Sequence, residues 1–140
     1  MSLLDKISDL ARRIAQQFND LPKPTYYLWA EQNGGLRDNR YEWSFGNGME
    51  DDGNYLVLMS DGVITQISLN VDKAPTSTCW VEARVNGQSA ALVTLSAGRT
   101  SDVDYVALPF AVQRGDRLQF RTILAGKASK GVVMVEIETR

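Results

Sequence analysis

The hydrophobic period of this chain changes once, near residue 22, and that change limits the folds open to it. Before it, apolar side chains recur at alternating spacings of four and three residues, as they do along one face of a helix. After it, short aromatic and aliphatic runs alternate with polar residues and are separated by Gly, Asn and Asp clusters, which is typical of short strands. Pro22 and Pro24 stand at the change and end the helix, because proline has no backbone N–H to donate.

The helical segment predicts an assembly surface. Ser2 with Asp5 three residues later resembles a capping box at its start. The a and d positions of a heptad pattern are occupied by Leu3, Ile7, Leu10, Ile14, Gln17 and Leu21. A helix this short is marginal alone and needs a partner surface, which is either its own domain or further copies of itself. We favour a self-associating bundle, because the Pro-Lys-Pro segment is a semi-rigid spacer that would hold the helix away from its own domain. Isoleucine at the a positions leaves the number of helices in the bundle open.

The rest of the chain predicts an all-β domain. Strands are expected at residues 26–30, 41–45, 55–59, 63–71, 79–85, 91–95, 105–112, 117–123 and 132–138. Asn86-Gly87 gives the strongest hairpin signal. Eight or nine strands at this density predict an antiparallel β-sandwich or jelly roll rather than a βαβ fold. The expected organisation is an amphipathic helix at 1–21, a Pro-rich linker at 22–25 and a β-sandwich head at 26–140.

Composition excludes several classes of function. The 140 residues include no histidine and one cysteine, Cys79, so a histidine-based triad, a His-ligated zinc and an intrachain disulfide are impossible. The net charge of −2 argues against nucleic-acid binding. The sequence contains no run of about 20 apolar residues, so it does not predict a membrane-spanning helix. The acidic loop at residues 50–54 lacks the EF-hand ligand spacing, and we interpret it as a solvated turn between two strands. We therefore expect no enzyme activity, no metal and no cofactor.

Aromatic residues gather between positions 26 and 55 and supply the candidate binding surface. Strand alternation places Tyr41, Trp43 and Phe45 on one face and Tyr27 with Trp29 on another, so most of them are expected in the core or in a subunit interface. An exposed aromatic ring with a polar rim also suits stacking against a sugar. The candidate ligand-binding residues on this ground are Trp29, Asn33, Arg37, Asn39 and Arg40.

Several segments resemble fibre and adhesion proteins of tailed bacteriophages. These are YLWAE at 27–31 and, most specifically, YEWSFGNG at 41–48. The segments VALPF at 106–110 and VQRGDRLQF at 112–120 are similar to trimeric jelly-roll heads and to C1q- and TNF-like modules. The resemblance covers roughly residues 26–138 and departs from long tail fibres in having one short helix and no extended shaft.

The resemblance implies a homotrimer on the virion, made in the host cytoplasm, whose helix forms a stalk or contacts other virion proteins. It also implies a head that attaches to the host surface, often through glycans. Its short length leaves a capsid decoration or head-fibre protein anchored by the helix as an alternative. A lectin-like carbohydrate-binding module and a polysaccharide-depolymerising enzyme are the alternatives of other classes.

Overall fold

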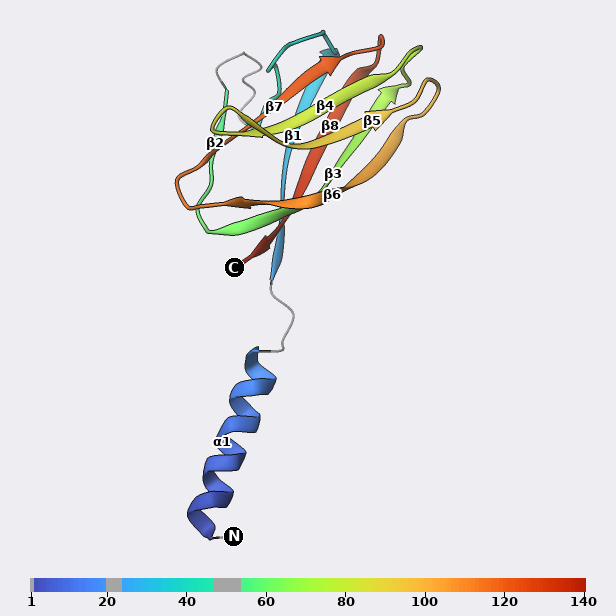
Figure 1. The fold of residues 1–140 in the computed structure, drawn as a ribbon. Helices are drawn as coiled ribbons and strands as arrows, with labels where there is room; N and C mark the ends of the chain where they lie inside the picture. The colour runs from blue at the N-terminus through green and yellow to red at the C-terminus, as the bar shows by residue number, and fades with distance from the viewer. Residues whose placement is uncertain (1, 20–23, 47–53) are drawn as a thin grey trace.

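The structure, a computed structural model, describes residues 2–19, 24–46 and 54–140. One helix, α1 (Leu3–Asn19), precedes a two-layered β-sandwich (Figure 1). The strands of the described residues are β1 (Thr25–Gly35), β2 (Leu56–Val57), β3 (Gly62–Lys73), β4 (Cys79–Val85), β5 (Gln88–Leu95), β6 (Ser101–Val112), β7 (Arg117–Leu124) and β8 (Ser129–Thr139).

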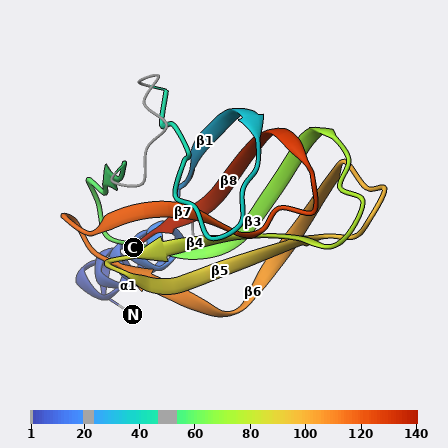
Figure 2. The ribbon, with the colours of Figure 1, turned by 90° about the horizontal axis from the view of Figure 1, so that it is seen from above.

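The strands form two antiparallel four-stranded sheets with the topology of a jelly roll. One sheet has the order β1-β8-β3-β6 and is called the β1 sheet below; the other has the order β2-β7-β4-β5 and is called the β4 sheet. The first strand pairs with the last, the second with the seventh, the third with the sixth and the fourth with the fifth. This nested ribbon folds over so that its pairs alternate between the two layers seen in Figure 2, which confirms the predicted fold class.

The core lies between the two sheets and follows the predicted alternation most closely in β4. Cys79, Val81, Ala83 and Val85 are all at most 2% exposed and face the opposite sheet. The β1 sheet contributes a matching set of buried residues: Ile64, Ile67, Leu69, Val133, Val135 and Ile137. Interdigitation of two such apolar faces is the main stabilising contact of a β-sandwich.

The hairpin between β4 and β5 has the turn that its sequence predicts. Asn86 and Gly87 both have positive φ angles, 51° and 81°. A two-residue type I′ turn requires positive φ at both positions, and Asn-Gly adopts it with the least strain. The hairpin prediction is therefore confirmed, and β5 begins at Gln88, three residues before the expected start at residue 91.

The segment at residues 41–45, predicted as a strand, is not a strand in the structure. It belongs to the connection after β1, and the backbone of this connection pairs with the sheets through isolated bridges, Arg40 with Thr122 and Ser44 with Glu31. Trp43 is 1% exposed and its indole N–H donates to the Thr122 hydroxyl at 3.1 Å. Phe45 stacks on Phe120 with ring centroids 5.6 Å apart. The expectation of a core position is confirmed for Trp43, and Phe45 is partly buried against the core.

Bulges in β3 and β6 break the period in the middle of the β1 sheet. Thr65 is an extra residue opposite β8, because Ile64 pairs with Ile137 and Gln66 with the adjacent Glu136. Residues 106–109 of β6 form a wider bulge opposite the same point of β3. β6 is an edge strand, where a bulge containing Pro109 costs no ladder hydrogen bond to a further strand. Buried and outward residues therefore alternate regularly in β3 only from Ile67 onward.

Candidate functional site

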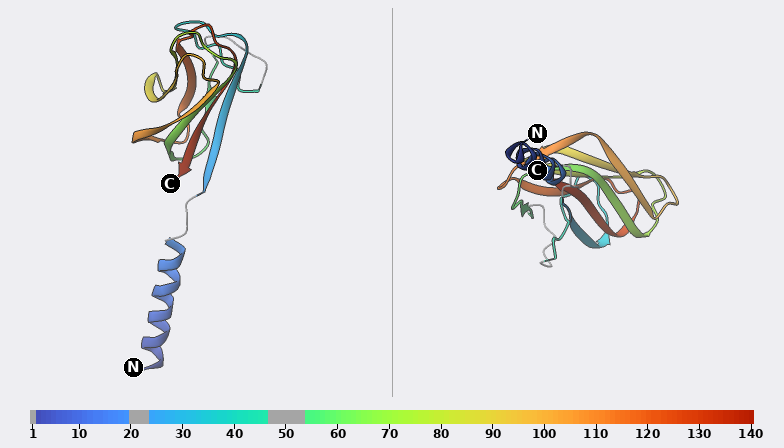
Figure 3. Two further views of the ribbon diagram at one scale, coloured as in Figure 1. Left: turned by 90° about the vertical axis from the view of Figure 1, so that its right-hand side faces the viewer. Right: turned by 90° about the horizontal axis from the view of Figure 1, so that it is seen from below.

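The helix α1 carries the first candidate surface. Ser2 and Asp5 form the predicted capping box: the Asp5 amide donates to the Ser2 hydroxyl at 3.2 Å and the Ser2 amide to the Asp5 carboxylate at 3.3 Å. Figures 1 and 3 show the helix projecting away from the sandwich. The helix ends at Asn19, and the predicted stop at Pro22 lies outside the described residues.

The predicted stripe on α1 is uncovered. The exposed fractions are 74% for Leu3, 56% for Ile7 and 57% for both Leu10 and Ile14. Gln17 is exposed as well, and the predicted position Leu21 lies outside the described residues. Leu4, 71% exposed, lies beside the stripe and widens it, although it is not an a or d position. Four large aliphatic side chains in a row on one helix face form a surface that needs a partner to be shielded from water.

The structure separates the five predicted ligand-binding residues into two groups. Trp29 lies on β1, 48% exposed on the outer surface of the β1 sheet. Asn33 is exposed near the end of the same strand. The other three, Arg37, Asn39 and Arg40, lie in the connection after β1 and run beside β7 of the β4 sheet. Ligand binding by these residues stays a prediction, and any single ligand would have to reach across the end of the sandwich.

The connection that holds Arg37, Asn39 and Arg40 is fastened to the head by its own polar groups. Arg37 forms a two-pronged ion pair with Glu42. Asn39, at a φ of 58°, accepts a hydrogen bond from Arg121 at 3.0 Å. The Arg40 amide and carbonyl are both bonded to the backbone of Thr122, at 3.2 and 2.8 Å. These contacts give the three residues a structural role in addition to the predicted one.

A larger exposed surface lies on the outer side of the β1 sheet, and Trp29 belongs to it. Side chains from β1, β8 and β6 meet there, and together they are called the aromatic face below: Tyr27, Trp29, Val103, Tyr105, Val132 and Met134. Their register is continuous across the sheet: Tyr27 pairs with Glu136, which pairs with Gln66, which pairs with Tyr105. In the next row Trp29, Met134, Ser68 and Val103 follow one another.

Sequence reasoning found the β1 part of this face and missed the rest. Tyr27 and Trp29 were placed on one face by their period of two, and both are indeed outward and about half exposed. Tyr105, 82% exposed, was assigned to a strand but to no surface. The alternation in β6 and β8 carries the missing signal, but only the pairing of β1 with β8 and of β3 with β6 brings the residues together.

Glu136 is the polar centre of the aromatic face. Its carboxylate accepts hydrogen bonds from Thr65 at 2.8 Å, Gln66 at 2.6 Å and Tyr27 at 3.1 Å. The bonds from Thr65 and Gln66, assisted by Tyr27, lower the pKa of Glu136, and partial burial opposes them. The carboxylate is therefore ionised at neutral pH and its oxygens are already supplied with donors. Tyr27, Gln66, Ser68, Val103, Met134 and Glu136 line a shallow hollow of about 140 Å³ beside it.

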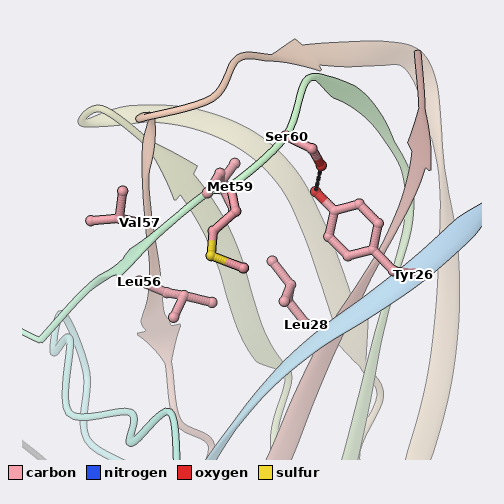
Figure 4. A pocket seen from close by; sticks show the side chains of 7 residues that line it. Tyr26, Leu28, Leu56, Val57, Met59 and Ser60 are labelled. Carbon is pink, nitrogen blue, oxygen red and sulfur yellow. Dashed lines mark hydrogen bonds between the residues drawn. The ribbon is translucent and has the colours of Figure 1, made fainter.

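A second hollow opens between the two sheets at the edge formed by β1 and β2. Its volume is about 350 Å³, and its lining is apolar apart from the Ser60 hydroxyl, which donates to the Tyr26 hydroxyl at 3.2 Å. Figure 4 shows Leu56 and Met59 on one side and Leu28 on the other. Met59 is 86% exposed at its rim, so this edge of the head presents further apolar surface to solvent.

The outer side of the β4 sheet has a different character. Glu82 points outward there, yet it is only 4% exposed, because Arg84 and Arg121 lie against it at 2.8 and 3.5 Å. Arg121 in turn lies over the ring of Tyr41, 5.7 Å from its centre. The connection after β1 therefore covers part of this sheet with charged groups. Cys79, on the inward side, has its pKa raised to about 11 by burial and by the charge of Asp38, which makes it a poor nucleophile.

Within the described part of the chain, no group of three or more Asp, Glu or Cys side chains is placed to hold a metal ion. The acidic loop considered above lies outside that part, apart from Asn54. No helix of the described residues is long and apolar enough to cross a lipid bilayer.

No model of a known protein family matches the sequence, and no curated protein matches it. The structure is similar to the CBM36-1 domain of a multidomain xylanase from the hindgut metagenome of Trinervitermes trinervoides, with a TM-score of 0.50 and 9% identity over 84% of this chain and 98% of that domain. It is also similar to a chain in the acidic stable capsid of Helicobacter pylori bacteriophage KHP30, with a TM-score of 0.46 and 16% identity over 84% of this chain and 90% of that one.

A third similar structure is the globular domain of zebrafish complement 1qA protein, with a TM-score of 0.43 and 15% identity over 81% of this chain and 95% of that one. At identities this low, a structural match reports the fold and not the activity. The chain is thus a jelly-roll β-sandwich on an N-terminal helix, an architecture compatible with a structural or a binding role.

Proposed function

We propose that this chain is a non-enzymatic structural protein of a bacteriophage virion, a short trimeric fibre or appendage whose head attaches to the host surface. The observation that carries the proposal is the uncovered stripe of Leu3, Ile7, Leu10 and Ile14 on a helix that projects from a folded head. The 3.5-residue spacing of the stripe suits packing against identical helices.

The energetics support self-association. A 17-residue helix is close to the lower limit of stability in water, and this one gains no cover from its own head for the stripe. Burying a large aliphatic side chain contributes about 1.5 to 3 kcal/mol. Four such side chains on each of several copies supply enough free energy to offset the entropy of association. The choice of a virion as the location is supported by the segments at 27–31 and 41–48 that resemble phage fibre proteins, and the choice of three copies by the segments at 106–110 and 112–120 that are similar to trimeric jelly-roll heads.

The attachment role is supported by what the head exposes. The absence of histidine from the sequence speaks for binding rather than catalysis, and Arg37, Asn39 and Arg40 are exposed on the head. Tyr27 and Trp29 are half exposed on β1 and are available to a ligand as long as no second head covers them. The same observation favours the second candidate, a lectin-like carbohydrate-binding module, because exposed aromatic rings stack on sugar rings. Binding to host cells or to a glycan array, lost in Trp29→Ala or Arg40→Ala while the circular dichroism spectrum stays unchanged, supports an attachment role through these residues.

The mass of the full-length protein in solution tests the proposal. We expect a trimer by sedimentation equilibrium at micromolar concentration. Ile14→Glu is expected to dissociate it, because a charge at an a position cannot be buried among three helices. Ala15→Glu places the same charge at the neighbouring position, outside the stripe, and is expected to leave the mass unchanged. A monomeric wild-type protein contradicts self-association; a monomer that still co-sediments with capsids through α1 favours the alternative of a capsid decoration protein.

A further inference from the structure

We infer that the aromatic face of the β1 sheet is the surface through which the heads of neighbouring copies contact one another. The inference rests on the self-association proposed above and adds to it a second interface, within the heads. It assigns Tyr27, Trp29 and Tyr105 to that interface and commits to a second copy of this chain as the occupant.

The aromatic face exposes about as much surface as the largest apolar patch of a typical monomer, a patch that is often functional. Tyr27, Trp29 and Tyr105 are 53%, 48% and 82% exposed, and side chains of this size leave on the order of 400 Å² uncovered at these fractions. Val103 and Val132, 51% and 40% exposed, extend the same surface. Glu136 and Gln66 separate Tyr27 from Tyr105, so the face mixes apolar and polar groups as protein interfaces do. The three aromatic side chains supply about half of the roughly 800 Å² that one partner contributes to a standard interface.

The polar groups within this face are prepared for burial. Covering a carboxylate is costly where its hydrogen-bonding capacity is unmet. Glu136 accepts from Thr65, Gln66 and Tyr27, all three from its own sheet, which fills most of the roughly four acceptor sites of its carboxylate before any neighbour arrives. For a sugar, whose hydroxyls bind by exchanging hydrogen bonds with carboxylates and amides, Glu136 has little acceptor capacity left. The chemistry of the face therefore favours a protein surface as the occupant.

Covalent geometry brings the heads of one assembly together. α1 ends at Asn19 and β1 begins at Thr25, so the connection spans at most about 20 Å. Helices in a bundle lie about 8–10 Å apart, and the heads that follow them are held side by side. Linkers of this length produce effective concentrations in the millimolar range. Tyr27 and Trp29 lie two and four residues after the start of β1, in the part of the head that follows the connection from α1 most directly.

The opposite side of the head is less suited to the same contact. The outer surface of the β4 sheet carries Glu82, Arg84 and Arg121, and the connection after β1 lies across part of it. Its exposed Trp80, at 37%, and Leu92, at 43%, stand beside these charges. The contrast provides a matched control, since each sheet has one partly exposed tryptophan on its outer side, Trp29 and Trp80.

The experiment compares full-length Trp29→Lys, Tyr105→Lys and Trp80→Lys with the wild-type protein and with Ile14→Glu. Sedimentation equilibrium gives the assembly constant, and hydroxyl-radical oxidation of Met134 reports whether the aromatic face is covered. Met59, 86% exposed at the other edge of the head, is the internal reference. We expect Trp29→Lys and Tyr105→Lys each to weaken assembly roughly 30-fold, the loss typical of an interface hot spot. Trp80→Lys is expected to behave as the wild type.

Met134 is expected to be oxidised more slowly in the wild type than in dissociated Ile14→Glu, with Met59 oxidised equally in both. Equal oxidation of Met134 in these two proteins, or a Trp29→Lys protein that assembles like Trp80→Lys, overturns the inference and leaves the helix bundle standing. Dissociation by Trp29→Lys but not by Ile14→Glu overturns the role of the helix and retains the head contact. Unchanged assembly of Trp29→Lys with loss of glycan binding identifies a carbohydrate as the occupant and overturns the inference too.

Discussion

Gly131 on β8 is fitted to the indole ring of Trp43, which closes one end of the core. A Cβ at this glycine would lie 2.8 Å from Cη2 and 3.2 Å from Cζ3 of Trp43. The ring cannot withdraw without breaking the bond from its N–H to Thr122, and the bond from the Asn54 amide to the Trp43 carbonyl at 2.8 Å fixes the backbone as well. One small residue in a strand thus positions a whole connection.

Gly131→Ala is therefore expected to lower the free energy of unfolding by about 1–3 kcal/mol, the usual cost of overpacking a filled core. Gly34→Ala is the control, because a Cβ on Gly34 meets no atom within 4 Å. Urea unfolding followed by tryptophan fluorescence measures both. Equal stability of the two variants would show that Trp43 can shift at little cost.

Glu136 makes stability depend on pH. Its pKa is lowered in the folded head from the ordinary 4.5, so the unfolded chain binds this proton more readily. The contribution to stability is complete above the unfolded value and is lost as pH falls through the lowered folded pKa. Glu136→Gln is expected to flatten the fall in stability below pH 4.5, measured by urea unfolding at a series of pH values. Glu138→Gln, two residues along the same strand, controls for the loss of a charge; if it flattens the fall equally, the network around Glu136 is not the cause.

At the scale of elements, the sequence predicts what depends on near neighbours and fails where distant segments decide. The β4–β5 hairpin follows from Asn86-Gly87 and from the alternation of residues 79–85, which are local signals. Residues 41–45 show the same alternation without forming a strand. Their neighbours Glu31 and Thr122 come from different sheets and offer one bridge each instead of a continuous edge.

The two candidate surfaces also differ in whether the sequence alone predicts them. The stripe on α1 is readable in the sequence because a helix face depends only on spacing. The aromatic face cannot be read from the sequence, because only the strand order β1-β8-β3-β6 places Tyr27 in the same row of the sheet as Tyr105, 78 positions away in the chain. The bulge at Thr65 also shifts the parity of β3 midway, so that Ile64 is fully buried although it lies out of phase with Ile67, Leu69 and Val71.

At the scale of the whole molecule, the jelly roll joins the first strand of the head to the last, so that β1 and β8 lie side by side. The strand that leaves the helix is thereby paired along most of its length with the strand that carries Met134 and Glu136. A force or a constraint applied through α1 is passed directly to the β1 sheet. Assembly of the helices and stability of the head are thus expected to be coupled.

This coupling predicts that the thermal midpoint of the full-length protein rises with its concentration, because unfolding of an assembled chain includes dissociation. A tenfold change in an equilibrium constant corresponds to about 1.4 kcal/mol. A tenfold change in protein concentration is therefore expected to shift the thermal midpoint by a few degrees for a domain of this size. Far-ultraviolet circular dichroism or differential scanning calorimetry over roughly a hundredfold range of protein concentration measures it. Ala15→Glu should keep the dependence and Ile14→Glu should lose it; a midpoint that is the same at every concentration in the wild type means that the heads unfold independently of assembly.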